Sequence, residues 1–192
     1  PTKTIGAYGS GGAMLTDSDA YAQTARLLRY HGDVGKGLYA RPGFNRQMDS
    51  LQAAVIDVKL DYIDWWQSRR VEIARRFSDR LAGVQDVGLL KTLPGNIHTF
   101  HKYVFSVRNR DEVRQFLDAR GVQTRVHYPV PLHLQPCFLD GSPTLSLPNA
   151  ERAAKDILSL PMYPELTDEE ADYILKKFIE VWIYIGIHAR GT

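Results

Sequence analysis

The apolar residues between Met48 and Leu81 recur every three or four positions, and this long helical repeat is the strongest constraint on the fold. A single helix of about 35 residues would be about 50 Å long, which is longer than a compact domain usually contains. We therefore expect the segment either to connect two bodies or to break near Gln67 and Ser68.

The segments before and after this repeat divide the chain into two predicted domains. Residues 11–16 predict a short buried strand, and Thr16 with Asp19 has the spacing of a helix N-cap and its acidic partner. Residues 31–45 contain four glycines and one proline, which predicts a loop. A change of composition near Pro94 places the boundary, giving domains of residues 1–93 and 94–192.

The second domain reads as a small α/β unit. Hydrophobic patterns predict a strand at residues 102–107, a helix at 109–120 and a strand at 122–127. Prolines make residues 127–136 an extended loop. Two final helices should begin at Asn149 and Thr167, the latter with Glu170 at capping-box spacing.

Composition excludes several classes of function. The 192 residues carry 24 Lys and Arg against 22 Asp and Glu, without the basic cluster expected of a nucleic-acid binder. No stretch approaches the length of a membrane span, and Cys137 is the only cysteine, so no intramolecular disulfide forms. The six histidines lack metal-ligand spacing, and no metal is expected. We expect a cytoplasmic protein with no nucleic-acid or membrane partner.

Lys3 is the first candidate for chemistry because it precedes a glycine-rich run, GAYGSGG at residues 6–12. A lysine becomes a nucleophile when burial or a neighbouring cation lowers its pKa, and glycines let a backbone approach a cofactor closely. The glycine spacing fits neither a phosphate-binding P-loop nor a dinucleotide fingerprint. Taken alone, Lys3 fits a solvated terminal residue better.

Four segments resemble, in the same order, motifs of the DegT/DnrJ/StrS family of sugar aminotransferases. They are PTKTIGAYGSGGA at residues 1–13, GFNRQMDSLQAA at 43–54, VHYPVPLHLQP at 126–136 and LSLPMYPELT at 158–167. The resemblance implies an α/β protein, namely the C-terminal part of a fold type I transferase that uses pyridoxal 5′-phosphate (PLP). It also implies a long connecting helix and a small α/β C-terminal domain.

The resemblance implies roles for six residues. Lys3 would form the Schiff base with PLP and carry the proton between donor and cofactor. Asn45 would reach across a dimer interface to the cofactor phosphate of the other subunit, although it could also be a plain helix N-cap. His127 and Tyr128 would line the sugar-nucleotide site, and His133 and Arg46 are further candidates for substrate binding.

The resemblance implies transfer of an amino group from a donor such as glutamate or glutamine to a keto-sugar, expected to be nucleotide-linked, in a homodimer with shared active sites. The chain should be a C-terminal half that is inactive alone. Alternatives are a keto-cyclitol acceptor, a non-catalytic binding or regulatory module, and a non-functional fragment. Three departures from the family pattern, Gln47, Ser10 and Thr4, leave the substrate open.

Overall fold

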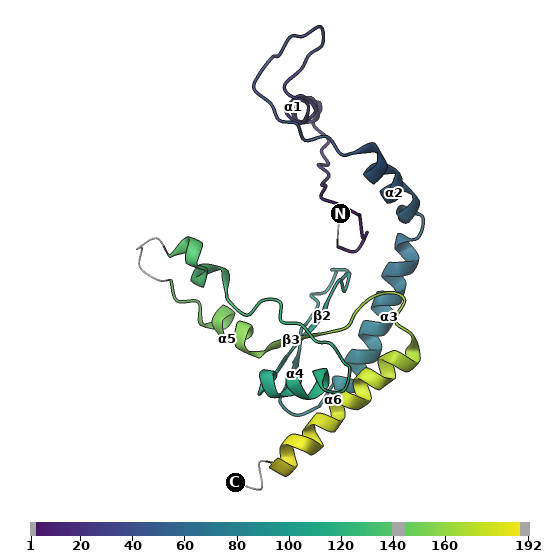
Figure 1. The fold of residues 1–192 in the computed structure, drawn as a ribbon, viewed down its shortest axis with the longest axis vertical. Coiled ribbons are helices and arrows are strands. Elements are labelled where there is room, and N and C mark those ends of the chain that lie inside the picture. Colours follow the sequence, from purple (N-terminus) through teal and green to yellow (C-terminus); the bar gives the residue numbers. More distant parts are fainter. Residues whose placement is uncertain (1–2, 140–144, 189–192) are drawn as a thin grey trace. The chain divides into compact units, whose positions relative to one another are not determined.

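The computed structural model describes residues 3–139 and 145–188 and has mixed helix and sheet content, which confirms the predicted α/β class (Figure 1). Pro1 and Thr2 of the first motif lie outside the described residues. Contacts divide the chain into two compact units, residues 1–64 and residues 65–192. Each unit is described separately.

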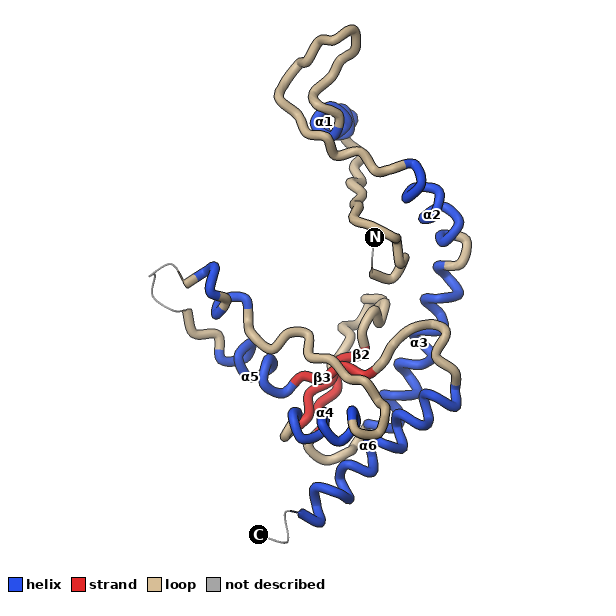
Figure 2. The backbone as a smooth tube through the Cα atoms, viewed as in Figure 1, coloured by secondary structure: helices blue, strands red, loops and turns tan. Residues whose placement is uncertain are grey.

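The first unit contains two helices, α1 (Asp19–Arg29) and α2 (Ser50–Leu60), joined by loop backbone (Figure 2). The N-cap of α1 is Ser18, whose hydroxyl accepts the Tyr21 amide at 3.4 Å, so the prediction of Thr16 as the cap is wrong. Residues 11–16 form no strand, which is also a correction. A strand requires a neighbouring strand for its hydrogen bonds, and the described part of this unit supplies none beside them.

The loop at residues 31–45 is confirmed and is fixed by its own backbone. Isolated antiparallel bridges pair Tyr30 with Asn45 and Asp33 with Tyr39. The Arg46 amide donates to the Arg29 carbonyl at 2.9 Å. These bonds hold the segment before α2 against the end of α1.

The long helical repeat forms two helices, because a turn at Asp61 and Tyr62 separates α2 from α3 (Ile63–Leu81). The break predicted at Gln67 and Ser68 is therefore misplaced. The helix continues through these positions, where Gln67 donates a side-chain hydrogen bond of 3.2 Å to the His98 carbonyl. The domain boundary at residues 93 and 94 stays a prediction, and contacts group most of α3 with the C-terminal elements.

The second unit is built on an antiparallel sheet in the order β1-β2-β3, formed by β1 (Val87–Leu89), β2 (Tyr103–Val107) and β3 (Ile157–Leu160). The strand predicted at residues 102–107 is confirmed as β2. The strand predicted at 122–127 is reduced to one bridge between Arg125 and Ser159. On the side of β2 away from β1 the sheet continues with β3, a strand that the hydrophobic pattern did not predict.

The described part of this unit has three further helices: α4 (Arg110–Asp118), α5 (Pro148–Asp156) and α6 (Asp168–His188). The Pro-rich segment forms loops with two short 3-10 turns, at Leu132–Leu134 and Pro136–Phe138. The capping box of α6 is confirmed, since the Thr167 amide donates to Glu170 at 2.9 Å and the Glu170 amide to Thr167 at 3.2 Å. The predicted cap of α5 is wrong, because its N-cap is Leu147.

The core of the second unit lies where α3, α4 and α6 meet the sheet (Figure 1). In β2 alternate residues are buried, and the Phe105 ring meets that of Phe178 on α6 edge-on, with centroids 5.2 Å apart. Phe77 of α3 is also fully buried. No helix in the described ranges is both long and apolar enough to cross a bilayer.

Candidate functional site

Lys3 lies exposed at the start of a turn that leads into the glycine-rich run. Gly6 in this turn has φ +69°, a left-handed conformation that favours glycine. Two side chains of α2 contact the turn: Gln52 accepts the Tyr8 amide at 3.0 Å, and Lys59 donates to the Gly6 carbonyl. The amine of Lys3 is thus presented to solvent from a turn that is tied to a helix.

A pocket of about 940 Å³ in the first unit brings together the glycine-rich run, α1 and the segment before α2. Arg26, Arg29, Asn45 and Arg46 are among its lining residues. Arg26 and Arg29 share one side of α1 because they are three residues apart. Asn45 is not the cap of α2, since Asp49 takes that position, and this removes the simplest structural explanation of Asn45.

The chemistry of this pocket favours an anion. Its described lining contains three guanidinium groups and the Asn45 amide, and none of these lining residues is acidic. Guanidinium groups bind phosphate through paired hydrogen bonds, and an amide adds a neutral donor. Gln47 and Ser10, which depart from the family pattern, also line this pocket, whereas Thr4 does not and nothing in the structure explains its substitution.

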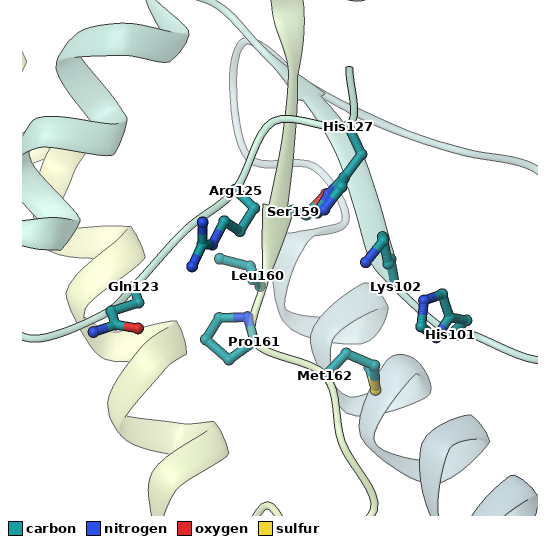
Figure 3. Close-up of a pocket in the computed structure, with 9 residues that line it drawn as sticks. All are labelled: His101, Lys102, Gln123, Arg125, His127, Ser159, Leu160, Pro161 and Met162. Atoms are coloured by element: carbon teal, nitrogen blue, oxygen red, sulfur yellow. The ribbon is translucent and has the colours of Figure 1, made fainter. Parts of the chain in front are cut away.

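A second pocket, of about 310 Å³, lies in the C-terminal unit around His127 (Figure 3). His101, Lys102 and Arg125 also line it, and none of its described lining residues is acidic. In Figure 3, His101 and Lys102 come from the segment before β2 and Arg125 from the segment that bridges to β3. His127 lies on the loop that follows Arg125. The basic lining suits a negatively charged or polyhydroxylated ligand.

Backbone pairing with β3 fixes the position of His127. The Arg125 amide donates to the Ser159 carbonyl at 3.1 Å, and the Ser159 amide returns a bond of 2.8 Å to the Arg125 carbonyl. Ser159 Oγ then lies 3.0 Å from His127 Nδ1. Ser159 lines the pocket and Leu158 lies in the core, while Leu160 belongs to the core and also borders the pocket.

A buried arginine braces the wall of this second pocket. Arg70 on α3 is 7% exposed and donates to the Met162 carbonyl at 3.0 Å and to the His101 carbonyl at 3.5 Å. Burial lowers the pKa of the Arg70 guanidinium from its ordinary value, though Glu165 opposes this shift. Arg70 stays protonated, as arginine does in proteins, and its hydrogen bonds join two of the segments that line the pocket.

Tyr128 and His133 lie in different surroundings from His127. Tyr128 is exposed, and its ring meets the His127 ring edge-on at 5.5 Å. His133 Nε2 lies 3.2 Å from Glu151 Oε1 and does not line the pocket around His127. The pKa of Glu151 is lowered first by the Leu147 amide and then by His133, so His133 has a structural partner at the start of α5.

The structure therefore brings Asn45 and Arg46 together in one pocket and places His127 in another, while Lys3 and its turn lie in the same unit as Asn45. Sequence reasoning missed Arg26 and Arg29 of the first pocket, although their i, i+3 spacing is visible in the sequence. It also missed four residues of the second pocket: His101, Lys102, Arg125 and Ser159.

Comparison with known proteins finds the same likeness over most of the chain. The sequence profile of the DegT/DnrJ/EryC1/StrS aminotransferase family matches residues 1–179. A pleiotropic regulatory protein of Geobacillus stearothermophilus is 41% identical over 187 residues, which are 95% of this chain and 50% of that protein. The dTDP-3-amino-3,4,6-trideoxy-alpha-D-glucose transaminase of Streptomyces venezuelae is 39% identical, over 89% of this chain and 45% of the relative.

Solved structures resemble the fold equally well. DesV of S. venezuelae, in complex with a ketimine intermediate, superposes with a TM-score of 0.87 at 37% identity, over 92% of this chain and 48% of that one. NtdA of Bacillus subtilis, with bound cofactor PMP, gives a TM-score of 0.85 at 31% identity, over 93% of this chain and 43% of that one. The chain spans about half the length of the relatives it matches.

Proposed function

Because the chain belongs to the DegT/DnrJ/EryC1/StrS aminotransferase family, we propose that this protein is a PLP-dependent aminotransferase. It moves an amino group from an amino-acid donor, such as glutamate or glutamine, to a keto-sugar. The observation that carries the proposal is the place of Lys3 in the family's lysine segment, on a turn held by α2. PLP requires an amine for its attachment and hydrogen-bond donors for its phosphate; Lys3 would supply the first, and the arginine-lined pocket of the other subunit the second.

Bound PLP would supply a conjugated ring that takes up the electron pair released at the Cα of the donor. The Lys3 amine would hold the cofactor covalently. When free, the same amine would act as the base that takes the proton from Cα of the donor and later returns a proton to the acceptor carbon. The glycine-rich turn after Lys3, which Gln52 and Lys59 hold, supports this role.

Asn45 and Arg46 would hold a phosphate, with Arg26 and Arg29 beside them. In the family that the sequence resembles, the asparagine at this position serves the cofactor of the other subunit, so the proposal includes a homodimer with shared sites. The absence of acidic side chains among the described lining residues supports an anionic ligand there.

The pocket around His127 would receive the acceptor. Two relatives are named as transaminases of nucleotide-linked sugars, the S. venezuelae protein and the UDP-2-acetamido-2-deoxy-3-oxo-D-glucuronate aminotransferase of Pseudomonas aeruginosa, which is 36% identical over 86% of this chain. The imidazole of His127, held by Ser159, and the cations Lys102 and Arg125 suit hydroxyl and diphosphate groups. We therefore favour a nucleotide-linked keto-sugar over a keto-cyclitol.

The experiment is borohydride trapping of PLP on the full-length protein, followed by peptide mapping, with Lys3→Ala and the exposed Lys91→Ala as a matched pair. We expect a reduced PLP adduct on Lys3, no adduct and no transamination in Lys3→Ala, and both features intact in Lys91→Ala. An adduct on a different lysine, or transamination by Lys3→Ala, would contradict the proposal.

A regulatory function is the second candidate, because two relatives at 41% identity are named as a pleiotropic regulatory protein and as the sensory transduction protein EryC1 of Saccharopolyspora erythraea. This candidate predicts ligand binding without turnover. Binding of a nucleotide sugar by a wild-type protein that forms no Lys3 adduct would favour it.

A further inference from the structure

The turn that follows Lys3 is tied to α2 by two side chains, Gln52 and Lys59. Gln52 Oε1 accepts the Tyr8 amide at 3.0 Å. Lys59 Nζ donates to the Gly6 carbonyl and also lies 4.5 Å from the centre of the Tyr8 ring, a cation–π distance. Each side chain therefore restrains a backbone group of the turn, and Lys59 restrains the Tyr8 ring as well.

The glycines of the turn make room for these two side chains. A Cβ atom on Gly9 would lie 3.0 Å from Gln52 Nε2, and one on Gly6 would lie 3.4 Å from Lys59 Nζ. Gly6 also has φ +69°, which other residues rarely adopt. Gly6 and Gly9 thus have a local explanation, namely close approach of Lys59 and Gln52, whereas a Cβ atom on Gly12 would meet nothing within 4 Å.

Both side chains belong to one face of α2, because seven residues are nearly two helical turns. The half-buried residues of α2 are Gln52, Val55, Ile56 and Lys59, which recur at helical spacing, while its other residues are exposed. Residues 4–7 of the turn are likewise half-buried, whereas Lys3 is exposed. The burial of this face of α2 and of the turn thus does not extend to the Lys3 side chain.

We propose that Gln52 and Lys59 are positioning residues for Lys3. By fixing the turn, they hold the backbone of Lys3 in one position, from which its side-chain amine extends. The inference rests on the proposed role of Lys3. A reacting amine displaced by about 1 Å loses much of the advantage of proximity, about 100-fold at the extreme. Loosening the turn should therefore lower kcat and leave ground-state binding of either substrate unchanged.

The test measures backbone amide exchange and steady-state kinetics on four variants of the full-length protein. Gln52→Leu removes the acceptor and Gln52→Glu keeps one; Lys59→Met removes the charge and Lys59→Arg keeps it. In Gln52→Leu we expect the Tyr8 amide to exchange about ten-fold faster, as expected for loss of one hydrogen bond. We expect kcat to fall about ten-fold in Gln52→Leu and Lys59→Met, with KM for both substrates within about two-fold.

The conservative variants and a distant lysine serve as controls. Gln52→Glu and Lys59→Arg should keep most of the protection and most of kcat, and the exposed Lys91→Met should match the wild type. Wild-type exchange at Tyr8 in Gln52→Leu would overturn the inference. So would protection lost throughout residues 3–64, because the two side chains would then merely stabilise the unit.

Failure of this inference is distinguishable from failure of the proposed function. Amide exchange requires no catalysis, so it reports on the turn even in an inactive protein. Transamination by Lys3→Ala overturns the proposed function. Unchanged exchange at Tyr8 in Gln52→Leu, or unchanged kcat in Gln52→Leu and Lys59→Met, overturns the positioning role alone.

Discussion

Gly32 and Gly43 lie where the loop before α2 folds back on itself. A Cβ atom on Gly32 would lie 1.8 Å from the Arg41 carbonyl oxygen, and one on Gly43 would lie 2.3 Å from the Gly32 amide nitrogen. Gly32 also has φ +78°. Two segments of the loop backbone approach each other so closely that only glycine fits, and this approach holds Asn45 and Arg46 beside α1.

Gly32→Ala should lower the free energy of unfolding by about 3 kcal/mol or more, because it combines a left-handed backbone with a clash against a carbonyl. Gly35→Ala is the matched control, since Gly35 has φ +93° but no heavy atom within 4 Å of the added Cβ. Its cost should be about 1–2 kcal/mol, the backbone term alone. Urea unfolding of both variants measures the difference, and equal losses would contradict the predicted clash.

Helices α3 and α6 are joined by a small network of ion pairs. Arg69 contacts Asp168 at 2.6 Å, and Arg76 contacts Asp168 at 3.0 Å and Asp172 at 2.6 Å. Hydrogen bonding from Arg69 holds the pKa of Asp168 below its ordinary value of 3.8, and Arg76 does the same for Asp172. The carboxylates of Asp168 and Asp172 therefore bind protons less readily in the folded protein than in the unfolded chain. The network contributes stability above pH 3.8 that is lost as the pH falls below it.

Asp168→Asn should lower Tm at pH 7 by no more than a few degrees, because the pairs are partly exposed. Its Tm should then fall less steeply than that of the wild type as the pH drops below about 4. Thermal melts across this range measure both effects. Asp79→Asn is the control, since Asp79 and Arg75 are 3.7 Å apart and 70% and 84% exposed. A pH profile of Asp168→Asn that matches the wild type would refute the role of the network.

The C-terminal unit as a whole depends on one apolar core shared by α3, β2, α4, β3 and α6. Phe178→Ala should lower the free energy of unfolding by about 3–5 kcal/mol, because Phe178 is fully buried against Phe105 and the cavity would not close. Leu90→Ala, at a residue 63% exposed, should change it by less than about 0.5 kcal/mol. Chemical unfolding measures both, and a small loss in Phe178→Ala would mean that the core is less tightly packed than described.

Across the molecule, sequence reasoning succeeded best with periodic patterns. The helix of residues 109–120 and the β2 strand were predicted because periodicity depends on residues a few positions apart. Caps were predicted less well: the Thr167–Glu170 capping box is present, whereas the caps expected at Thr16 and Asn149 were wrong. The strand expected at 122–127 was wrong, because this segment makes only one bridge, from Arg125 to Ser159 of β3. The strand β3 itself, which pairs with β2, was not predicted. Choice of strand partner depends on packing and burial that local pattern does not contain.

Ordered motifs in the sequence identify the family and single out Lys3, Asn45 and His127 as candidates. The side chains that stand beside these residues became known only from the folded chain: Arg26 and Arg29 near Asn45, Ser159 against His127, and Gln52 and Lys59 on the turn after Lys3. A motif fixes residue types over a few positions, whereas pockets and side-chain contacts join residues tens of positions apart, whose proximity exists only once the backbone has folded.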